Sequence, residues 1–172
     1  LKGKTALICG ASRGIGAATA RIMAKAGANV IIASRSEEQL KSLLKELPAL
    51  GNGQHRTLVM DLEETDSIER TLQPILDDGP IHILVNNAGG PPGGPLLNAT
   101  VDELAQPFTR HLHAAHTLVK LLTPGMILAN YGRIIQIIST SVREPIPNLG
   151  VSNTLRGAMA SWAKSLSREL HP

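Results

Sequence analysis

A glycine-rich turn near the start of the chain has the residue types and spacing of a phosphate-binding site. It reads Gly10-Ala-Ser12-Arg13-Gly14-Ile15-Gly16, between an apolar run and a helical pattern. Gly10 is expected to make the sharp turn off a strand, Gly14 to let the backbone approach a pyrophosphate, and Gly16 to let the helix pack closely. The helix N-terminus would then bind the phosphates with its free N–H groups and partial positive charge. By itself, the spacing G-x-x-x-G-x-G is equally compatible with a plain turn.

Short apolar runs alternate with helical patterns along the whole chain. Runs rich in Ile, Val and Leu, typical of strands buried on both faces of a parallel sheet, lie at 4–9, 28–34, 56–60, 81–86 and 133–138. Helical patterns lie at 15–27, 37–47, 65–77, 102–123 and 152–170, and Gly27, Gly79 and Gly125 are placed as C-terminal caps. This alternation predicts an α/β fold of right-handed βαβ units: a three-layer, doubly wound parallel sheet, the Rossmann fold.

In a doubly wound sheet, ligands bind beyond the carboxyl ends of the strands. The motifs that follow the five predicted strands are the glycine turn, Ser34-Arg35, Asp61-Leu62, Asn86-Asn87-Ala88-Gly89 and Ser139-Thr140-Ser141. All five are therefore expected at one edge of the sheet. Tyr131, the only tyrosine, precedes the fifth strand and is expected at the opposite edge, where it would be a poor catalytic residue.

The composition argues against several other classes of function. The formal net charge of the 172 residues is only +3 and 2% of them are aromatic, so we do not expect nucleic acid as a partner. No apolar stretch of the chain reaches the length of a transmembrane helix, so we do not expect a membrane either. Its one cysteine, Cys9, cannot form an internal disulfide, which fits a cytoplasmic protein. His111, His113 and His116 have no carboxylate or cysteine at ligand spacing beside them, so we expect no metal site.

These motifs together resemble the short-chain dehydrogenase/reductase family, and within it the 3-oxoacyl-(acyl-carrier-protein) reductase-like branch. The resemblance is carried by the glycine turn, Asp61, the Asn-Asn-Ala-Gly motif at 86–89, Gly132-Arg133-Ile134-Ile135 and Ile137-Ile138-Ser139. It covers nearly the whole chain and implies a single NAD(P)-binding Rossmann domain over residues 1–172. Family members continue further, so we expect that this chain, ending at His171-Pro172, is truncated after the sixth helix and lacks the C-terminal part of the fold.

The resemblance implies NADP(H) as the cofactor. A carboxylate at the end of the second strand would favour NAD, but this chain has the neutral Ser34 followed by Arg35, with Arg13 in the glycine turn. Two guanidinium groups would bind a 2′-phosphate, unless both are solvated surface residues. Asp61 is expected at the adenine amino group, or as a helix N-cap with Glu64 in capping-box spacing. The other predicted cofactor contacts are Gly10, Ser12, Gly14, Ile15, Gly16, Leu62 beside the adenine, and Asn87, Ala88, Gly89 and Gly90 beneath the ribose.

The family's carbonyl reduction uses a serine, a tyrosine acid, a lysine and an asparagine, and only the serine is found here. Aligned on Ser139, the tyrosine position holds Ser152, the lysine position Arg156 and the asparagine position His111. Ser152 is too weak an acid to replace a phenol, and Arg156 keeps a positive charge that can hold the cofactor ribose but gives up no proton. His111 is the one group expected to titrate near neutrality, so either it acts as the acid or it packs at a helix interface between subunits.

Two functions from different classes remain open. The first is an NADP(H)-dependent oxidoreductase that reduces a carbonyl of a small-molecule or acyl-carrier substrate. Its acid would be His111 or water, with Ser139 orienting the oxygen and Arg156 holding the cofactor. The second is a catalytically inactive NADP-binding sensor or scaffold, which the missing tyrosine favours. In both cases, the apolar faces of the helices at 102–123 and 152–170 predict a homo-oligomer, a tetramer of two-fold pairs.

Overall fold

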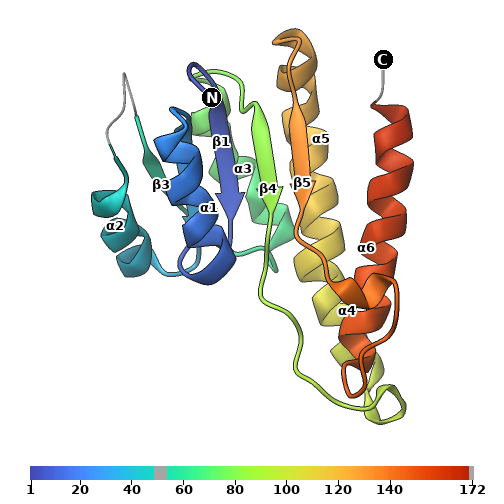
Figure 1. The fold of residues 1–172 in the computed structure, drawn as a ribbon. Coiled ribbons are helices and arrows are strands. Elements are labelled where there is room, and N and C mark those ends of the chain that lie inside the picture. Colours follow the sequence, from blue (N-terminus) through green and yellow to red (C-terminus); the bar gives the residue numbers. More distant parts are fainter. Residues whose placement is uncertain (49–53, 171–172) are drawn as a thin grey trace.

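A five-stranded parallel sheet in the order β3-β2-β1-β4-β5 forms the centre of the computed structural model, which describes residues 1–48 and 54–170 (Figure 1). Its strands are β1 (Thr5–Cys9), β2 (Asn29–Ser34), β3 (Arg56–Val59), β4 (Ile83–Asn86) and β5 (Arg133–Gln136). The α-helices are α1 (Gly14–Lys25), α2 (Glu37–Glu46), α3 (Thr65–Leu76), α4 (Val101–Phe108), α5 (Ala114–Leu128) and α6 (Gly150–Glu169). The strand order reverses between β1 and β4, which confirms the predicted doubly wound α/β fold.

Helices cover both faces of the sheet, because the strands are apolar on both sides. In β1, Ala6 and Ile8 belong to one buried cluster and Leu7 and Cys9 to the other, as the alternation of side chains along a strand requires. The first cluster is closed by α1 and α2, and the second by α3 and α5 (Figure 1). The result is the three-layer arrangement that the near-continuous apolar runs predicted.

The helical segment after β4 is longer and less regular than predicted. The pattern indicated one helix over 102–123, whereas the structure has α4, a π-helical segment at Thr109–His113, and then α5. Gly125 therefore lies inside α5 and is not the expected C-terminal cap, since the chain reverses only at Asn130, which has a φ of 48°. Met126 is buried and continues the apolar face of α5, so packing outweighs the weak helix propensity of glycine here.

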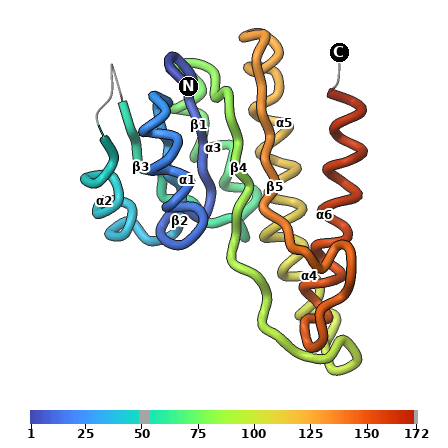
Figure 2. The backbone as a smooth tube through the Cα atoms, viewed as in Figure 1, coloured from blue at the N-terminus to red at the C-terminus, as the bar shows by residue number. Residues whose placement is uncertain are grey.

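The segments that follow β4 and β5 run beside each other beyond the carboxyl ends of the strands (Figure 2). A parallel bridge joins Gly94 to Leu149, and the backbone N–H of Gly150 donates to the carbonyl oxygen of Gly94 at 3.1 Å. This bridge brings the Gly- and Pro-rich loop after β4 to the start of α6. The loop residue Gly90 consequently lies near Arg156 of α6, whose Nη2 would be 3.7 Å from a Cβ atom built on Gly90.

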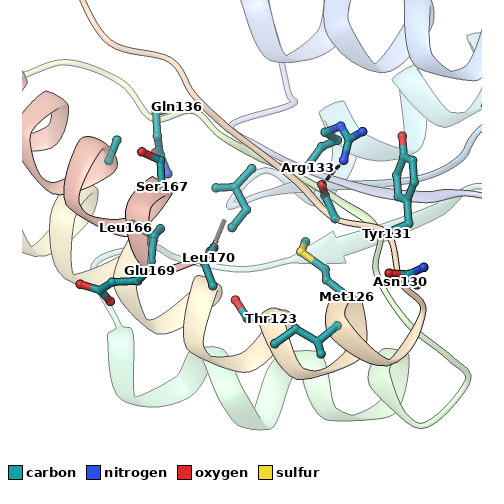
Figure 3. A pocket seen from close by; sticks show the side chains of 14 residues that line it. Thr123, Met126, Asn130, Tyr131, Arg133, Gln136, Leu166, Ser167, Glu169 and Leu170 are labelled. Carbon is teal, nitrogen blue, oxygen red and sulfur yellow. Dashed lines mark hydrogen bonds between the residues drawn. The ribbon is translucent and has the colours of Figure 1, made fainter. Parts of the chain in front are cut away.

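A groove of about 630 Å³ runs along β5, the edge strand, between that strand, α5 and α6 (Figure 3). Tyr131 lies at the amino end of β5, where its ring centroid is 6.2 Å from that of His82 and 4.2 Å from Nζ of Lys4. This end of the sheet is opposite to the glycine turn. The structure therefore confirms that Tyr131 is remote from the predicted cofactor edge, and the groove contains none of the predicted site residues.

Candidate functional site

The glycine turn has the conformation that its three glycines predicted. Gly10 and Gly14 have φ angles of +58° and +57°, in the left-handed region that favours glycine. A Cβ atom on Gly16 would lie 2.3 Å from the carbonyl oxygen of Gly10, so Gly16 is needed for close packing of α1 against the turn itself. The helix α1 begins at Gly14, and the side chain of its N-cap residue, Arg13, makes no capping hydrogen bond. The first turn of α1 is thus available to an anion.

Asn87 connects the end of β4 to the glycine turn. Its Nδ2 atom donates hydrogen bonds to the carbonyl oxygens of Cys9 and Gly10, both at 3.2 Å. Gly10 is also required by this contact, because a Cβ atom there would lie 2.6 Å from the carbonyl oxygen of Asn87. Cys9 is buried beside it, and burial raises the pKa of its thiol to about 12, which leaves a packing residue and not a nucleophile.

A hollow of about 500 Å³ opens in front of the turn and brings together most of the predicted cofactor residues. Predicted residues on its lining are Gly10, Ser12, Arg13, Ile15, Ser34, Arg35, Asp61, Leu62, Asn87, Ala88 and Gly89. Four predicted residues are not on this lining: Gly14 and Gly16 lie in the first turn of α1, Gly90 lines a neighbouring hollow of about 720 Å³, and Arg156 lies on α6. Residues that follow β1, β2, β3 and β4 thus line one hollow, whereas Ser139, which follows β5 and was expected at the same edge, is not on its lining.

Asp61 lines the hollow next to Arg35. Its Oδ2 atom is 3.7 Å from Nη1 of Arg35, and its Oδ1 atom accepts a hydrogen bond from the backbone N–H of Glu63 at 3.0 Å. The helix α3 begins at Thr65 with Glu64 as its N-cap residue, so the alternative role of Asp61 as the N-cap of a capping box is wrong. The turn that Asp61 makes ends before the helix, which leaves its carboxylate on the hollow.

His111 is buried, and the groups that face its two ring nitrogens fix it as the neutral ring with the hydrogen on Nε2. Nε2 lies 2.9 Å from the carbonyl oxygen of Gly89, which can only accept, so Nε2 carries the hydrogen. Nδ1 lies 3.5 Å from Nη1 of Arg156 and faces it as an acceptor. Burial, and then the positive charge of Arg156, lower the pKa of His111 to about 4.

The expectation that His111 titrates near neutrality is therefore wrong. At neutral pH the ring is uncharged, and its single N–H is already donated to Gly89. The sequence placed His111 correctly in a helix after β4 but could not show the guanidinium beside it. A π-helical segment holds this residue, a distortion often found at functional sites.

Arg156 places a buried cation at the predicted lysine position. Its side chain reaches from α6 to the residue that follows β5, where Nη1 donates to the carbonyl oxygen of Ile137 at 3.0 Å. Only 8% of Arg156 is exposed, and burial lowers the pKa of its guanidinium. Within the described residues, Nε of Arg156 is buried without a hydrogen-bond partner, so this cation has donors that are not used inside the protein.

Ser139 and Ser152 lie close to this cation along the chain. Ser139 follows β5 two residues after Ile137, and its Oγ accepts a hydrogen bond from the backbone N–H of Ser141 at 3.1 Å. Ser152 lies one helical turn before Arg156 on α6, and both serines are half-buried. Arg156 thus contacts both His111 and the carbonyl oxygen of Ile137, while Ser139 follows Ile137 in the chain and Ser152 precedes Arg156 on the same helix.

Arg110 and Glu63 are two site residues that the sequence analysis missed. Arg110 lines the hollow and forms an ion pair with Glu63, 47 residues earlier in the chain. Their neighbours gave a partial signal, because Arg110 precedes His111 and Glu63 follows Asp61 and Leu62. No local pattern indicates that the two charges meet.

A parallel doubly wound sheet with a glycine turn and ligand hollow at its carboxyl edge defines a dinucleotide-binding class of protein. Residues 4–172 match the short chain dehydrogenase family, and the chain belongs to this family of oxidoreductases. It is 33% identical over 171 residues to the ketoacyl reductase HetN of Nostoc sp., covering 99% of this chain and 59% of that protein. It is 35% identical over 173 residues to the 3-oxoacyl-[acyl-carrier-protein] reductase FabG of Vibrio harveyi, covering 99% of this chain and 68% of FabG.

A solved structure supports the same assignment. A metagenomic short-chain oxidoreductase in complex with NADP is 34% identical, has a TM-score of 0.91, and is matched over 99% of this chain and 76% of its own length. The chain thus spans 59% of the length of HetN, 68% of FabG and 76% of the metagenomic oxidoreductase. Within residues 1–48 and 54–170, no helix is long and apolar enough to cross a membrane.

Proposed function

We propose that this chain binds NADP(H) and forms the cofactor-binding part of an oxidoreductase that acts on a carbonyl or a secondary alcohol. The observation that carries the proposal is that Arg13, Arg35 and the neutral Ser34 all line the hollow in front of the glycine turn. The first turn of α1 fits a pyrophosphate, and the two guanidinium groups fit a 2′-phosphate. The bound nicotinamide would supply or accept a hydride.

The residues at the other end of the site fit a reaction in which solvent handles the proton. Ser139 can donate its hydroxyl hydrogen to a carbonyl oxygen. Arg156 keeps its proposed role of holding the cofactor ribose, for which it has unused N–H donors. Neutral His111 accepts from Arg156 and so positions the guanidinium rather than acting as an acid. With neither His111 nor a tyrosine available, water is the proposed proton donor.

The proposal is tested by measuring NADPH oxidation by the full-length protein against a panel of carbonyl compounds, with a binding titration alongside. Ser139→Ala should lower turnover by about 10²-fold, the order of one lost hydrogen bond to a developing oxyanion, while NADPH affinity is preserved. Tyr131→Phe serves as the control and should leave turnover unchanged, because residue 131 lies at the opposite edge of the sheet. Turnover that is insensitive to Ser139→Ala would contradict the assigned role.

A second candidate is an NADP-binding sensor or scaffold without catalysis. The engagement of His111 with Gly89 and Arg156 favours it, because this contact removes the one side chain proposed to replace the tyrosine acid. Tight NADPH binding with no carbonyl reduced across the panel would select this second function over the first.

Arg35→Asp is expected to lower the affinity for NADPH by about tenfold or more and to spare NADH. A charge-assisted contact is typically worth about 1.5–3 kcal/mol, and the new carboxylate would also repel the 2′-phosphate beside Asp61. Isothermal titration of the wild type and the variant with both cofactors measures the effect. Arg21→Asp is the control, because Arg21 pairs with Glu46 on the exposed surface of α1 and α2. Equal affinity of the wild type for NADPH and NADH would refute the proposed preference.

Properties of the whole protein follow as proposals from the same site and surface. We propose a small-molecule or acyl-carrier carbonyl as the substrate, a cytoplasmic location that suits the free Cys9 thiol, and a single NAD(P)-binding domain over residues 1–172. A homotetramer is proposed because Val101, Ile127 and Leu128 expose large apolar side chains on α4 and α5.

A further inference from the structure

Arg110 and Glu63 form an ion pair on the predicted cofactor hollow that the proposed function does not use. Nε of Arg110 donates to Oε1 of Glu63 at 2.6 Å, and Nη2 donates to the same oxygen. The other carboxylate oxygen accepts from Nε2 of Gln106 at 3.1 Å. The side chains of Arg110 and Glu63 are only 23% and 26% exposed, so the pair is largely shielded from water.

This ion pair fixes the orientation of the Arg110 guanidinium. Two donors on one carboxylate oxygen hold its plane, while Nη1 has no hydrogen-bond partner among the described residues. The backbone of Glu63 also donates to Asp61, so one short loop holds both the predicted adenine-binding carboxylate and the partner of Arg110. A guanidinium held in this way can stack on an aromatic ring with little further loss of side-chain entropy.

We propose that Arg110 forms one wall of the adenine pocket and stacks its guanidinium on the base, with Glu63 as its positioning residue. Arg110 lines the hollow together with Asp61 and Leu62, which were predicted at the amino group and the ring of adenine. A cation over a π face is attracted by the ring, and shielding from water strengthens the contact. The Arg110–Glu63 pair is neutral as a whole, so attraction of phosphates is left to Arg13 and Arg35. This inference rests on the proposed NADP(H) binding and extends it to base recognition.

The test is a titration of the full-length protein with NADPH and with 2′,5′-ADP, which carries only the adenosine end of the cofactor. Arg110→Ala should weaken both ligands by the same factor of about ten, because the lost contact is to the base that they share. Glu63→Gln should weaken both by about threefold, because Arg110 remains but its plane is held less firmly. Arg21→Ala is the matched control on the exposed surface and should change neither affinity.

Arg110→Lys separates stacking from charge, since lysine keeps the charge without the planar group. It should weaken binding as much as Arg110→Ala, and full affinity in this variant would overturn the stacking role. Wild-type affinity in Arg110→Ala, or a loss seen with NADPH but not with 2′,5′-ADP, would also overturn it. Failure of the wild type to bind either ligand would instead refute the proposed NADP(H) binding. Thermal unfolding without ligand identifies any variant that is destabilised. If Arg110→Ala is destabilised, the binding results of the milder variants Glu63→Gln and Arg110→Lys decide the outcome.

Discussion

Replacing Gly16 with alanine is expected to remove nucleotide binding and to destabilise the fold. The added Cβ atom would lie 2.3 Å from the carbonyl oxygen of Gly10 and 2.9 Å from Cα of Ala11, both rigid backbone atoms. The turn or the helix α1 must therefore shift, and the N–H groups at the start of α1 lose their alignment with the phosphates. Loss of two charge-assisted hydrogen bonds would lower NADPH affinity by about 100-fold or more. Isothermal titration measures the affinity, and urea unfolding measures the stability.

Gly157→Ala provides the matched control for Gly16→Ala. Gly157 lies on the exposed side of α6, and a Cβ atom there would meet nothing within 4 Å. Alanine is favoured over glycine in a helix interior, so the free energy of unfolding should rise by about 0.5–1 kcal/mol and NADPH affinity should stay unchanged. A Gly16→Ala variant that binds NADPH like the wild type would show that the tight turn is not the phosphate site.

Stability is expected to fall as the pH is lowered from about 6.5 to about 4, because His111 must stay neutral in the folded protein. Burial and the cation of Arg156 lower the pKa of His111 from 6.5 to about 4, and Arg110 adds to this effect. The unfolded chain therefore binds a proton at a higher pH than the folded one. The stability that depends on a neutral His111 is fully present above about pH 6.5 and is lost as the pH falls through the folded pKa of about 4. It amounts to about 3 kcal/mol in the free energy of unfolding.

His111→Asn isolates this contribution in urea unfolding measured between pH 4 and pH 7. Asparagine can still donate to the carbonyl oxygen of Gly89 but does not titrate, so the variant should lose less stability on acidification than the wild type. His113→Asn is the control in the same π-helical segment, since it makes the same substitution at an exposed side chain. His82, whose pKa is also lowered by burial, contributes in the same direction in all three proteins and cancels from their differences. Parallel pH profiles for the wild type and His111→Asn would contradict the buried neutral state.

The order of the elements and the edge of the sheet that carries the site were predictable from the sequence. Each depends on local information: the apolar period of a strand, the turn-forming glycines, and the rule that parallel strands end at one edge. The ends of the helix after β4 were not predictable in the same way. Pattern alone placed a cap at Gly125, but the burial of Met126 against the sheet carries α5 past it.

The protonation of His111, the partners of Arg156 and the Arg110–Glu63 pair were decided by the tertiary structure alone. His111 and Arg156 are 45 residues apart, and Arg110 and Glu63 are 47 residues apart. A residue's type sets its ordinary pKa, but the pKa in the protein depends on burial and on charges brought near it by folding. The sequence by itself determined the family and the glycine turn, and it predicted the positions where catalytic residues are replaced. The tertiary structure decided that the His111 ring is neutral at pH 7, because only the folded chain places a cation and a carbonyl oxygen on its two ring nitrogens.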